Sequence, residues 1–281
     1  MFDPPAHLGD AEVLEIVCRE WSPQVRQVEH LPVGFGAHHW RAATGDGPDL
    51  FVTFDTYAAR HTPGSLEAAY AGAAALADQG LDFVLPSVRA RSGKFTVSAA
   101  DGAISVTPWL DGHRPVDERA TPALLDRLHR AAPPRGLPVW APLTSPSFPD
   151  ELADRLGSPW DSGPHGAQVH AALTKRLAEI AHWNDRYLAL AAESDPAHFV
   201  PTHGEPGVRN QLQAEGHVWL VDWESLKLAP ADRDARPSPE LFDLEWRLDE
   251  IGQYATWFEG VHSDSRSDRV ALDGLLAELA R

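Results

Sequence analysis

Residues 203 to 224 read HGEPGVRNQLQAEGHVWLVDWE and place polar side chains around a predicted β-hairpin. Glu205 stands in a short loop that ends at Asn210, and Asp222 follows the apolar run after the turn at 214–216. Two strands joined by this turn would bring Asp222 back beside Asn210. A carboxylate and an amide held together bind a hard cation such as Mg²⁺, and a further carboxylate can accept a proton from a hydroxyl. These are the parts of a phosphoryl-transfer site.

The order of these residues resembles the aminoglycoside phosphotransferase family, a branch of the protein-kinase-like fold. The family pattern is His-Gly-Asp-x-x-x-x-Asn, and here Glu205 takes the place of the Asp. The resemblance implies Glu205 as the catalytic base, His203 as a residue that hydrogen-bonds the loop, and Asn210 and Asp222 as Mg²⁺ ligands. It also implies an acid that braces the loop, for which Asp234 is the candidate. An ordinary hairpin with polar ends is the alternative, but both halves of the motif in order favour the phosphotransferase.

Composition favours a soluble protein with one large domain or two lobes. The chain has 281 residues, of which 43% are hydrophobic and 23% are charged, so it can bury a substantial core. No apolar run approaches the roughly 18 residues of a membrane helix, and the N-terminus lacks a signal-peptide pattern. Cys18 is the single cysteine and cannot form an intramolecular disulfide. We therefore expect a cytoplasmic protein without a membrane partner.

Charge and motifs exclude several classes of function. The chain has 41 acidic and 24 basic residues, a net charge of −17, which disfavours nucleic-acid binding and would attract a small cationic substrate. Taken by itself, the acidic composition is more simply explained as a feature that keeps the protein soluble. The 14 histidines form no His-Glu-x-x-His motif, which makes a zinc site improbable. Neither a Gly-x-Ser-x-Gly elbow nor a P-loop motif is present.

The first part of the chain is rich in predicted strands. Periodicity predicts helices over 10–21 and 65–79, strands over 25–31, 41–44 and 50–54, and a hairpin formed by 94–99 and 103–107. The loop after the first strand contains Gly34, Phe35, Gly36 and His38, and its backbone N–H groups could lie over nucleotide phosphates. A simple turn is the alternative interpretation of these glycines.

The second part is predicted to be mainly helical, with helices over 122–132, 149–156, 169–192, 239–254 and 268–280. The element order resembles that of the same family, which implies an α+β, two-lobed protein-kinase-like fold. The implied divisions are a nucleotide-binding lobe over 1–107, a linker over 108–112, and a catalytic and substrate-binding lobe over 113–281. In that family the backbone of the linker holds the adenine, which here assigns Trp109 and Leu110. A loop at the end of a sheet is the alternative.

One departure from the family concerns nucleotide binding. The family carries a phosphate-contacting lysine on the third strand, where this chain has Thr53, and His39 stands in place of the third glycine of the loop. Threonine supplies only a hydroxyl to the nucleotide, so neutralisation of the phosphate charge must come from elsewhere. Candidates near in sequence are Arg41, Arg60, His38 and His39. In the family this lysine also pairs with a glutamate of the following helix, for which Glu67 is the candidate. With Thr53 in place of the lysine, Glu67 would have no basic partner there.

The resemblance implies a small-molecule kinase with Mg²⁺ as cofactor and ATP or GTP as phosphate donor. The acceptor would be a hydroxyl of a cationic aminoglycoside- or aminocyclitol-like substrate. Glu224 is expected to face this substrate because it follows Asp222, and Trp183 is a second candidate, although single tryptophans more often lie in a core. The alternative function is a catalytically inactive relative that binds a small molecule or a partner protein.

Overall fold

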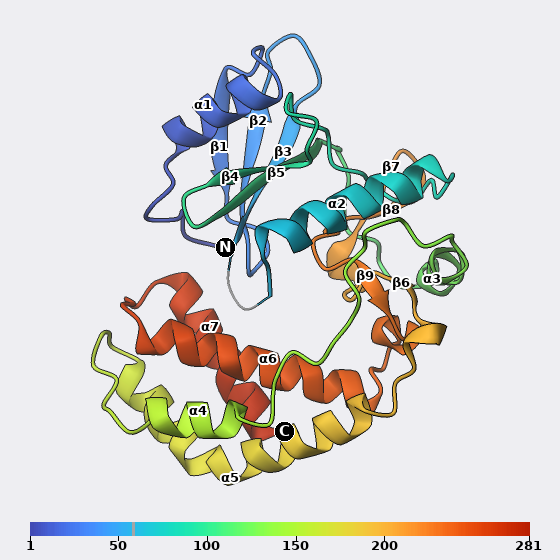
Figure 1. The fold of residues 1–281 in the computed structure, drawn as a ribbon. Helices are drawn as coiled ribbons and strands as arrows, with labels where there is room; N and C mark the ends of the chain where they lie inside the picture. The colour runs from blue at the N-terminus through green and yellow to red at the C-terminus, as the bar shows by residue number, and fades with distance from the viewer. Residues whose placement is uncertain (58–59) are drawn as a thin grey trace. The chain divides into compact units, whose positions relative to one another are not determined.

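The protein is described here by a computed structural model that covers residues 1–57 and 60–281 (Figure 1). The chain forms two compact units, each built from two stretches of sequence. The first unit comprises 1–140 and 196–234, and the second comprises 141–195 and 235–281.

An antiparallel five-stranded sheet forms the first part of the first unit. Its strands are β1 (Gln27–Leu31), β2 (His38–Ala43), β3 (Leu50–Thr56), β4 (Thr96–Ala99) and β5 (Gly102–Pro108), in the order β1-β2-β3-β5-β4. Gly45 adopts a φ of 81° in the turn between β2 and β3, and Ala100 a φ of 45° in the turn between β4 and β5. These tight turns give the neighbouring strands their register.

The two faces of this sheet differ in chemistry. On one face, Trp40, Val52 and Phe54 pack with Val13 and Val17 of α1 (Asp10–Glu20), which lies along the sheet in Figure 1. Because side chains alternate along a strand, the neighbouring residues of β2 and β3 point to the opposite face. That face carries the polar residues His39, Thr53, Asp55 and Ser105, all of them buried.

A second core joins α2 to the segments that follow it in the first unit. Helix α2 (Pro63–Asp78) begins with a capping box between Thr62 and Ser65 and packs with α3 (Thr121–His129) and with Leu220, Trp223 and Leu226. Strand β6 (Val200–Thr202) pairs with β9 (Lys227–Ala229), and β7 (Gln211–Ala214) forms a hairpin with β8 (His217–Leu220). Val84 forms a parallel bridge with Leu220, which attaches this hairpin to the chain after α2.

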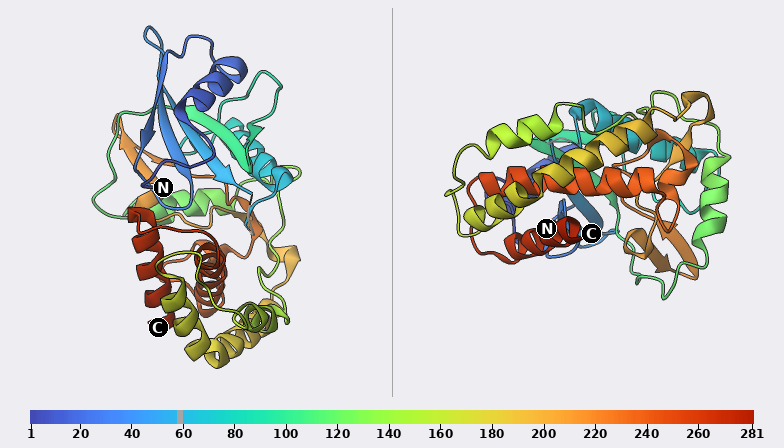
Figure 2. Two further views of the ribbon diagram at one scale, coloured as in Figure 1. Left: turned by 90° about the vertical axis from the view of Figure 1, so that its left-hand side faces the viewer. Right: turned by 90° about the horizontal axis from the view of Figure 1, so that it is seen from below.

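The second unit is helical. It consists of α4 (Phe148–Arg155), α5 (Gly166–Ala191), α6 (Glu240–Glu259) and α7 (Arg266–Ala280). Helices α5 and α6 run side by side in the right view of Figure 2, and α7 contacts both. Their buried apolar stripes, such as Leu173 and Ile180 of α5, form the core of this unit. Within residues 1–57 and 60–281 there are also three short 3₁₀ turns, all in the first unit: Pro196–His198, Val208–Asn210 and Ala231–Asp234.

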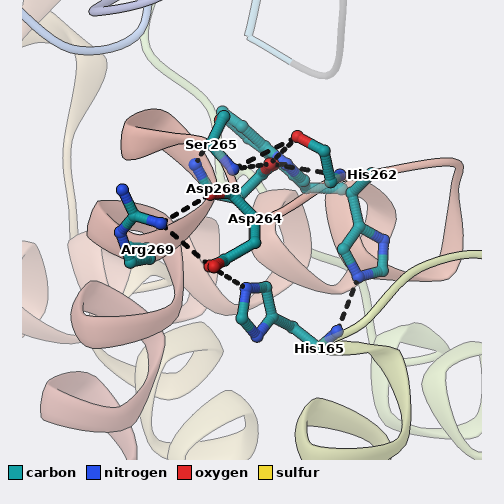
Figure 3. A network of polar contacts seen from close by, with 8 residues as sticks. His165, His262, Asp264, Ser265, Asp268 and Arg269 are labelled. Atoms are coloured by element: carbon teal, nitrogen blue, oxygen red, sulfur yellow. Dashed lines mark hydrogen bonds and ion pairs between the residues drawn. The ribbon is translucent and has the colours of Figure 1, made fainter.

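A polar network holds the ends of three helices of the second unit together (Figure 3). Asp268 near the start of α7 accepts hydrogen bonds from the hydroxyl of Ser263 and from the indole of Trp257 at the end of α6. The ring of His262 accepts a hydrogen bond from the backbone N–H of His165, where α5 begins. Burial opposes ionisation of Asp268, but these hydrogen bonds outweigh it and lower its pKa to about 2.

The predicted fold class is confirmed, and each predicted helix has an observed counterpart. The short strands β6 and β9 were not predicted, because three residues are too few to show a period. No helix within 1–57 or 60–281 combines the length and apolar character that a membrane span requires.

Candidate active site

The loop 203–210 follows β6 and is organised by the side chain of His203. Its Nδ1 accepts a hydrogen bond from the backbone N–H of Glu205 (3.3 Å), and its Nε2 donates to the carbonyl of Val221 (2.9 Å). The ring lies against Trp223, with 4.6 Å between the ring centroids. Burial lowers the pKa of His203, which agrees with a neutral ring that donates at one nitrogen and accepts at the other. His203 therefore fastens the loop to the segment that carries Asp222.

Asp234 braces the same loop from the other side. Its carboxylate accepts hydrogen bonds from the backbone N–H groups of His203 (3.0 Å) and Gly204 (2.5 Å), and it contacts Nε2 of His129 on α3 (2.9 Å). Only 1% of Asp234 is exposed. Burial would raise its pKa, but the hydrogen bond with His129 and the charge of Arg233 lower it. Asp234, which the sequence indicates as the acid that braces the loop, therefore contacts the loop directly.

Asn210 and Asp222 lie at the two ends of the β7–β8 hairpin, as the sequence predicts. The backbone carbonyl of Asn210 accepts from the N–H of Val221 (3.0 Å), which brings the following Asp222 beside it. The Asn210 side-chain NH₂ donates to the carbonyl of Glu205 (3.0 Å), so its oxygen is the atom that remains for a ligand. Asp222 is exposed and adopts a φ of 70°, a conformation that is uncommon for residues other than glycine and frequent at functional sites.

These residues fit a magnesium ion that is shared with a nucleotide. Among the described residues, no group of three or more His, Cys, Asp or Glu side chains is arranged to hold a metal by itself. Mg²⁺ is normally held by one or two protein groups and completed by phosphate oxygens and water. One carboxylate and one amide oxygen therefore suit this ion better than a closed protein site would.

The polar face of the sheet contributes to the surroundings of Asp222. Asp55 of β3 accepts a hydrogen bond from the hydroxyl of Tyr70 on α2 (2.8 Å). Thr53, two residues earlier on the same strand, contacts Nδ1 of His39 through its hydroxyl (3.2 Å). The charge of Asp222 affects the pKa values of both His39 and Asp55. The hairpin and the sheet face therefore form one electrostatic environment.

The fold and this geometry can be compared with known proteins. No protein-family model matches the chain. Protein StrN of Streptomyces griseus is 26% identical over 276 residues, which cover 86% of this chain and 82% of StrN. The crystal structure of spectinomycin phosphotransferase in complex with ADP and spectinomycin has a TM-score of 0.69 at 12% identity, covering 96% of this chain and 94% of that one. The chain has the fold of the aminoglycoside phosphotransferases.

A choline/ethanolamine kinase family protein from Mesorhizobium loti has the same overall fold, with a TM-score of 0.52 and 16% identity over 96% of this chain and 93% of its own. The protein-kinase-like fold expected from the hairpin motif is thus confirmed. At such low identities these similarities concern the fold, and the roles of individual residues rest on the geometry of this chain.

Within this phosphotransferase fold, Glu224 lies in a concentration of negative charge. Its Oε2 atom is shielded from solvent and has no hydrogen-bond partner among the residues that the structure describes. Burial, and next the charge of Asp222, raise the pKa of Glu224 well above its usual value. The charges of Glu205 and Asp55 act in the same direction. A cation bound here would relieve the part of this effect that comes from repulsion among the carboxylates.

The predicted nucleotide contacts are distributed along the sheet. Gly34 and Gly36 have φ values of 71° and 105°, which favour glycine, and Phe35 between them is 39% exposed. His38 lies on the α1 side of the sheet, where its ring is 6.0 Å from that of His30 and 6.3 Å from that of Trp40. Its position is therefore opposite to that of Thr53.

Trp109 and Leu110, which the sequence predicts to lie in a linker, follow β5 and are partly buried. The backbone N–H of Trp109 donates to the carbonyl of Asp49 (3.0 Å), so that donor is already used. The Trp109 ring lies 6.2 Å from the ring of Phe51 and beneath the guanidinium of Arg41, at 4.5 Å. The rings of Trp109 and Phe51 therefore lie side by side, and Phe51 is on the same face of β3 as Thr53.

Two residues have partners that the sequence did not indicate. The carboxylate of Glu67 accepts hydrogen bonds from the backbone N–H groups of Phe95 and Thr96, so it fastens α2 to β4 and is not left unpaired. Trp183 lies on α5 in the second unit, with the guanidinium of Arg247 4.6 Å from its ring centroid.

The sequence does not indicate Asp55 and Tyr70 as site residues. The available signal was an acidic residue that continues the apolar strand 50–54, which is unusual because buried carboxylates need partners. Burial raises the pKa of Asp55 from 3.8 to about 7, although the hydrogen bond from Tyr70 opposes this rise.

We expect Asp55 to make stability depend on pH. Because its pKa is higher in the folded protein, its stabilising contribution is complete below pH 3.8 and is lost as the pH rises through about 7. A change from 3.8 to 7 corresponds to at most about 4 kcal/mol. Asp55→Asn should remove this loss, so urea unfolding at pH 5 and pH 9 should give a smaller difference in free energy than for the wild type. The control is Asp46→Asn in an exposed turn, which should leave the pH dependence of stability unchanged. If Asp55→Asn also left it unchanged, Asp55 would not be the group responsible.

Proposed function

We propose that this protein is a small-molecule kinase that transfers the γ-phosphoryl group of ATP or GTP to a hydroxyl group. The observation that carries the proposal is the arrangement of three residues in a phosphotransferase fold, in which Asn210 is hydrogen-bonded to Glu205 and the bond from Val221 to Asn210 places Asp222 beside it. The loop and hairpin hold these groups by backbone contacts, so their positions are set before any substrate binds. In this proposal residues 1–107 bind the nucleotide, 108–112 are the linker, and 113–281 supply the catalytic residues and the acceptor site.

Each residue has a defined role. Glu205 accepts the proton of the acceptor hydroxyl as its oxygen attacks the phosphorus. Asn210 and Asp222 would hold Mg²⁺, which neutralises the phosphate charge when bound. His203 and Asp234 keep the loop in place through the contacts described above. Glu224 is the candidate contact for a positively charged part of the acceptor.

The acceptor is expected to be an aminoglycoside- or aminocyclitol-like molecule. Two observations support this class, the net charge of −17 and the position of Glu224 among the carboxylates of Asp222, Glu205 and Asp55, since both favour a cationic ligand. Spectinomycin phosphotransferase, whose fold this chain has, was crystallised with spectinomycin. A kinase that uses ATP or GTP in this way would act in the cytoplasm.

Thr53 in place of the lysine favours a second candidate function. A catalytically inactive relative would bind a small molecule or a partner protein and would need no phosphate-binding cation. In such a protein, Thr53 would simply be a β-branched residue suited to a strand. The two candidates differ in whether the protein binds a magnesium nucleotide.

Thermal unfolding with nucleotide tests the choice. For the wild type, ATP or GTP with Mg²⁺ should raise the melting temperature, since about 2.7 kcal/mol of stabilisation is expected at 100 times Kd, and EDTA should remove most of this gain. Asp222→Ala should lose the magnesium-dependent part. Asp126→Ala, which breaks only an exposed pair with Arg130 on α3, should keep it. A wild type that is stabilised by no nucleotide under any condition would support the inactive relative.

A further inference from the structure

His39 and Thr53 form a buried pair on the polar face of the N-terminal sheet. They are direct partners in the register of β2 and β3, and Nδ1 of His39 lies 3.2 Å from the Thr53 hydroxyl. Their exposed fractions are only 9% and 8%. The His39 ring is stacked on Phe51, with 5.0 Å between centroids and 29° between planes. The stacking and the hydrogen bond together fix the direction in which the ring points.

The other ring nitrogen of His39 points toward the glycine loop. A Cβ atom added at Gly34 would lie 3.1 Å from Nε2 of His39, and Gly34 has a φ of 71°. Because Nδ1 is occupied by the Thr53 hydroxyl, Nε2 is the ring nitrogen that could serve a ligand. When the Thr53 hydroxyl donates to Nδ1, the ring carries its proton on Nε2. The pair therefore presents an N–H donor beside the loop whose backbone could cover phosphates.

The ring is suited to act as a neutral donor. Burial lowers the pKa of His39 to about 4, although the charge of Asp222 opposes this change. A hydrogen bond from a neutral donor to a charged phosphate oxygen is stronger than one between two neutral groups. The charge of Asp222 also acts on the pKa of His39, so the ring and this candidate Mg²⁺ ligand share one electrostatic environment.

Of the other residues that the sequence offers for this task, Arg41 and His38 are placed less well. Arg41, on the same face of β2, is paired with Asp49 (2.7 Å), stacked over Trp109 and largely at the surface. His38 points to the α1 side of the sheet, among the rings of Trp40 and Phe54. Of the three residues Arg41, His38 and His39, it is His39 that both lies on the polar face of the sheet and comes close to Gly34.

We propose that Nε2–H of His39, held by Thr53, binds a phosphate group of the nucleotide and supplies the donor that the absent lysine would have supplied. This inference rests on the proposed kinase function. It also explains why two unusual residues occur together, since the histidine in place of the third glycine and the threonine in place of the lysine are hydrogen-bonded to each other. The donor is uncharged, so nucleotide affinity should depend strongly on magnesium.

Binding measurements with a nucleotide series test this assignment. The probes are ATP, ADP and adenosine, and the corresponding guanine series, titrated by calorimetry with Mg²⁺. His39→Leu should weaken binding of the preferred triphosphate and diphosphate by about 10- to 100-fold, because a charge-assisted hydrogen bond is lost, and should leave nucleoside binding unchanged. His39→Gln keeps an N–H donor and should restore part of the affinity. Thr53→Val should cause a smaller loss, because only the support of the ring is removed.

His38→Leu is the matched control, since it changes the neighbouring histidine on the opposite face. It should not alter the ratio of diphosphate to nucleoside affinity. An equal loss for diphosphate and nucleoside in His39→Leu, or full affinity in that variant, would overturn the role of His39 and leave the kinase proposal standing. A wild type that binds no nucleotide would overturn the proposed function itself, and this inference with it.

Discussion

Glu205→Gln is expected to lower kcat by about 10²- to 10⁴-fold, because it removes a general base from the transition state. Glutamine has nearly the same size, and the backbone of residue 205 is hydrogen-bonded to His203 and Asn210. The loop should therefore keep its conformation, and the affinity for the magnesium nucleotide should be unchanged. The measurement is steady-state phosphate transfer to the best acceptor from a panel of hydroxylated aminocyclitols, with nucleotide binding measured separately.

Glu215→Gln is the control for this experiment, because the same chemical change is made in the exposed turn of the β7–β8 hairpin. Its kcat should match that of the wild type. If Glu205→Gln retained kcat within a factor of about three, general-base contributions of the usual size would be excluded at this position. The role of Glu205 would then be limited to the charge that it contributes near Glu224.

Asp234→Ala is expected to be the most destabilising of the changes considered. It removes a buried charge that two backbone N–H groups and His129 contact, and leaves those donors without an acceptor. Removing one partner from such a buried charged network costs about 3–5 kcal/mol. The loop 203–210 would also lose its brace, so kcat should fall even at temperatures where the protein stays folded. Chemical unfolding followed by activity below the melting temperature separates the two effects.

Asp232→Ala provides the comparison, since Asp232 belongs to the same 3₁₀ turn but is exposed. Its stability should lie within about 0.5 kcal/mol of the wild type, as is usual for surface substitutions. Asp234→Asn keeps one acceptor oxygen and should recover part of the stability but little of the activity, because its NH₂ group faces backbone donors. Wild-type stability in Asp234→Ala would mean that the brace is not needed.

The helices, the main strands and the hairpin were predictable from the sequence, because their signals are local. An apolar period of 3.6 residues marks α5 and α7, and turn residues such as Gly45 and Gly216 mark the reversals of the chain. The candidate site was predictable in part for the same reason. Glu205, Asn210 and Asp222 lie within one short stretch, and a single hairpin is enough to bring them together.

The remaining contacts of the site join residues that are distant in the chain. His129 and Asp234 are 105 positions apart. Asp55 accepts a hydrogen bond from Tyr70, which lies on the helix after its strand. Which face of β2 is polar is decided by α1, which covers the side of Trp40 and leaves His39 on the other side. Strand alternation alone separates His38 from His39 but does not indicate which of them faces the site. Only packing of the whole unit makes that choice, because burying Trp40, Val52 and Phe54 under α1 turns His39 toward Thr53 and Gly34.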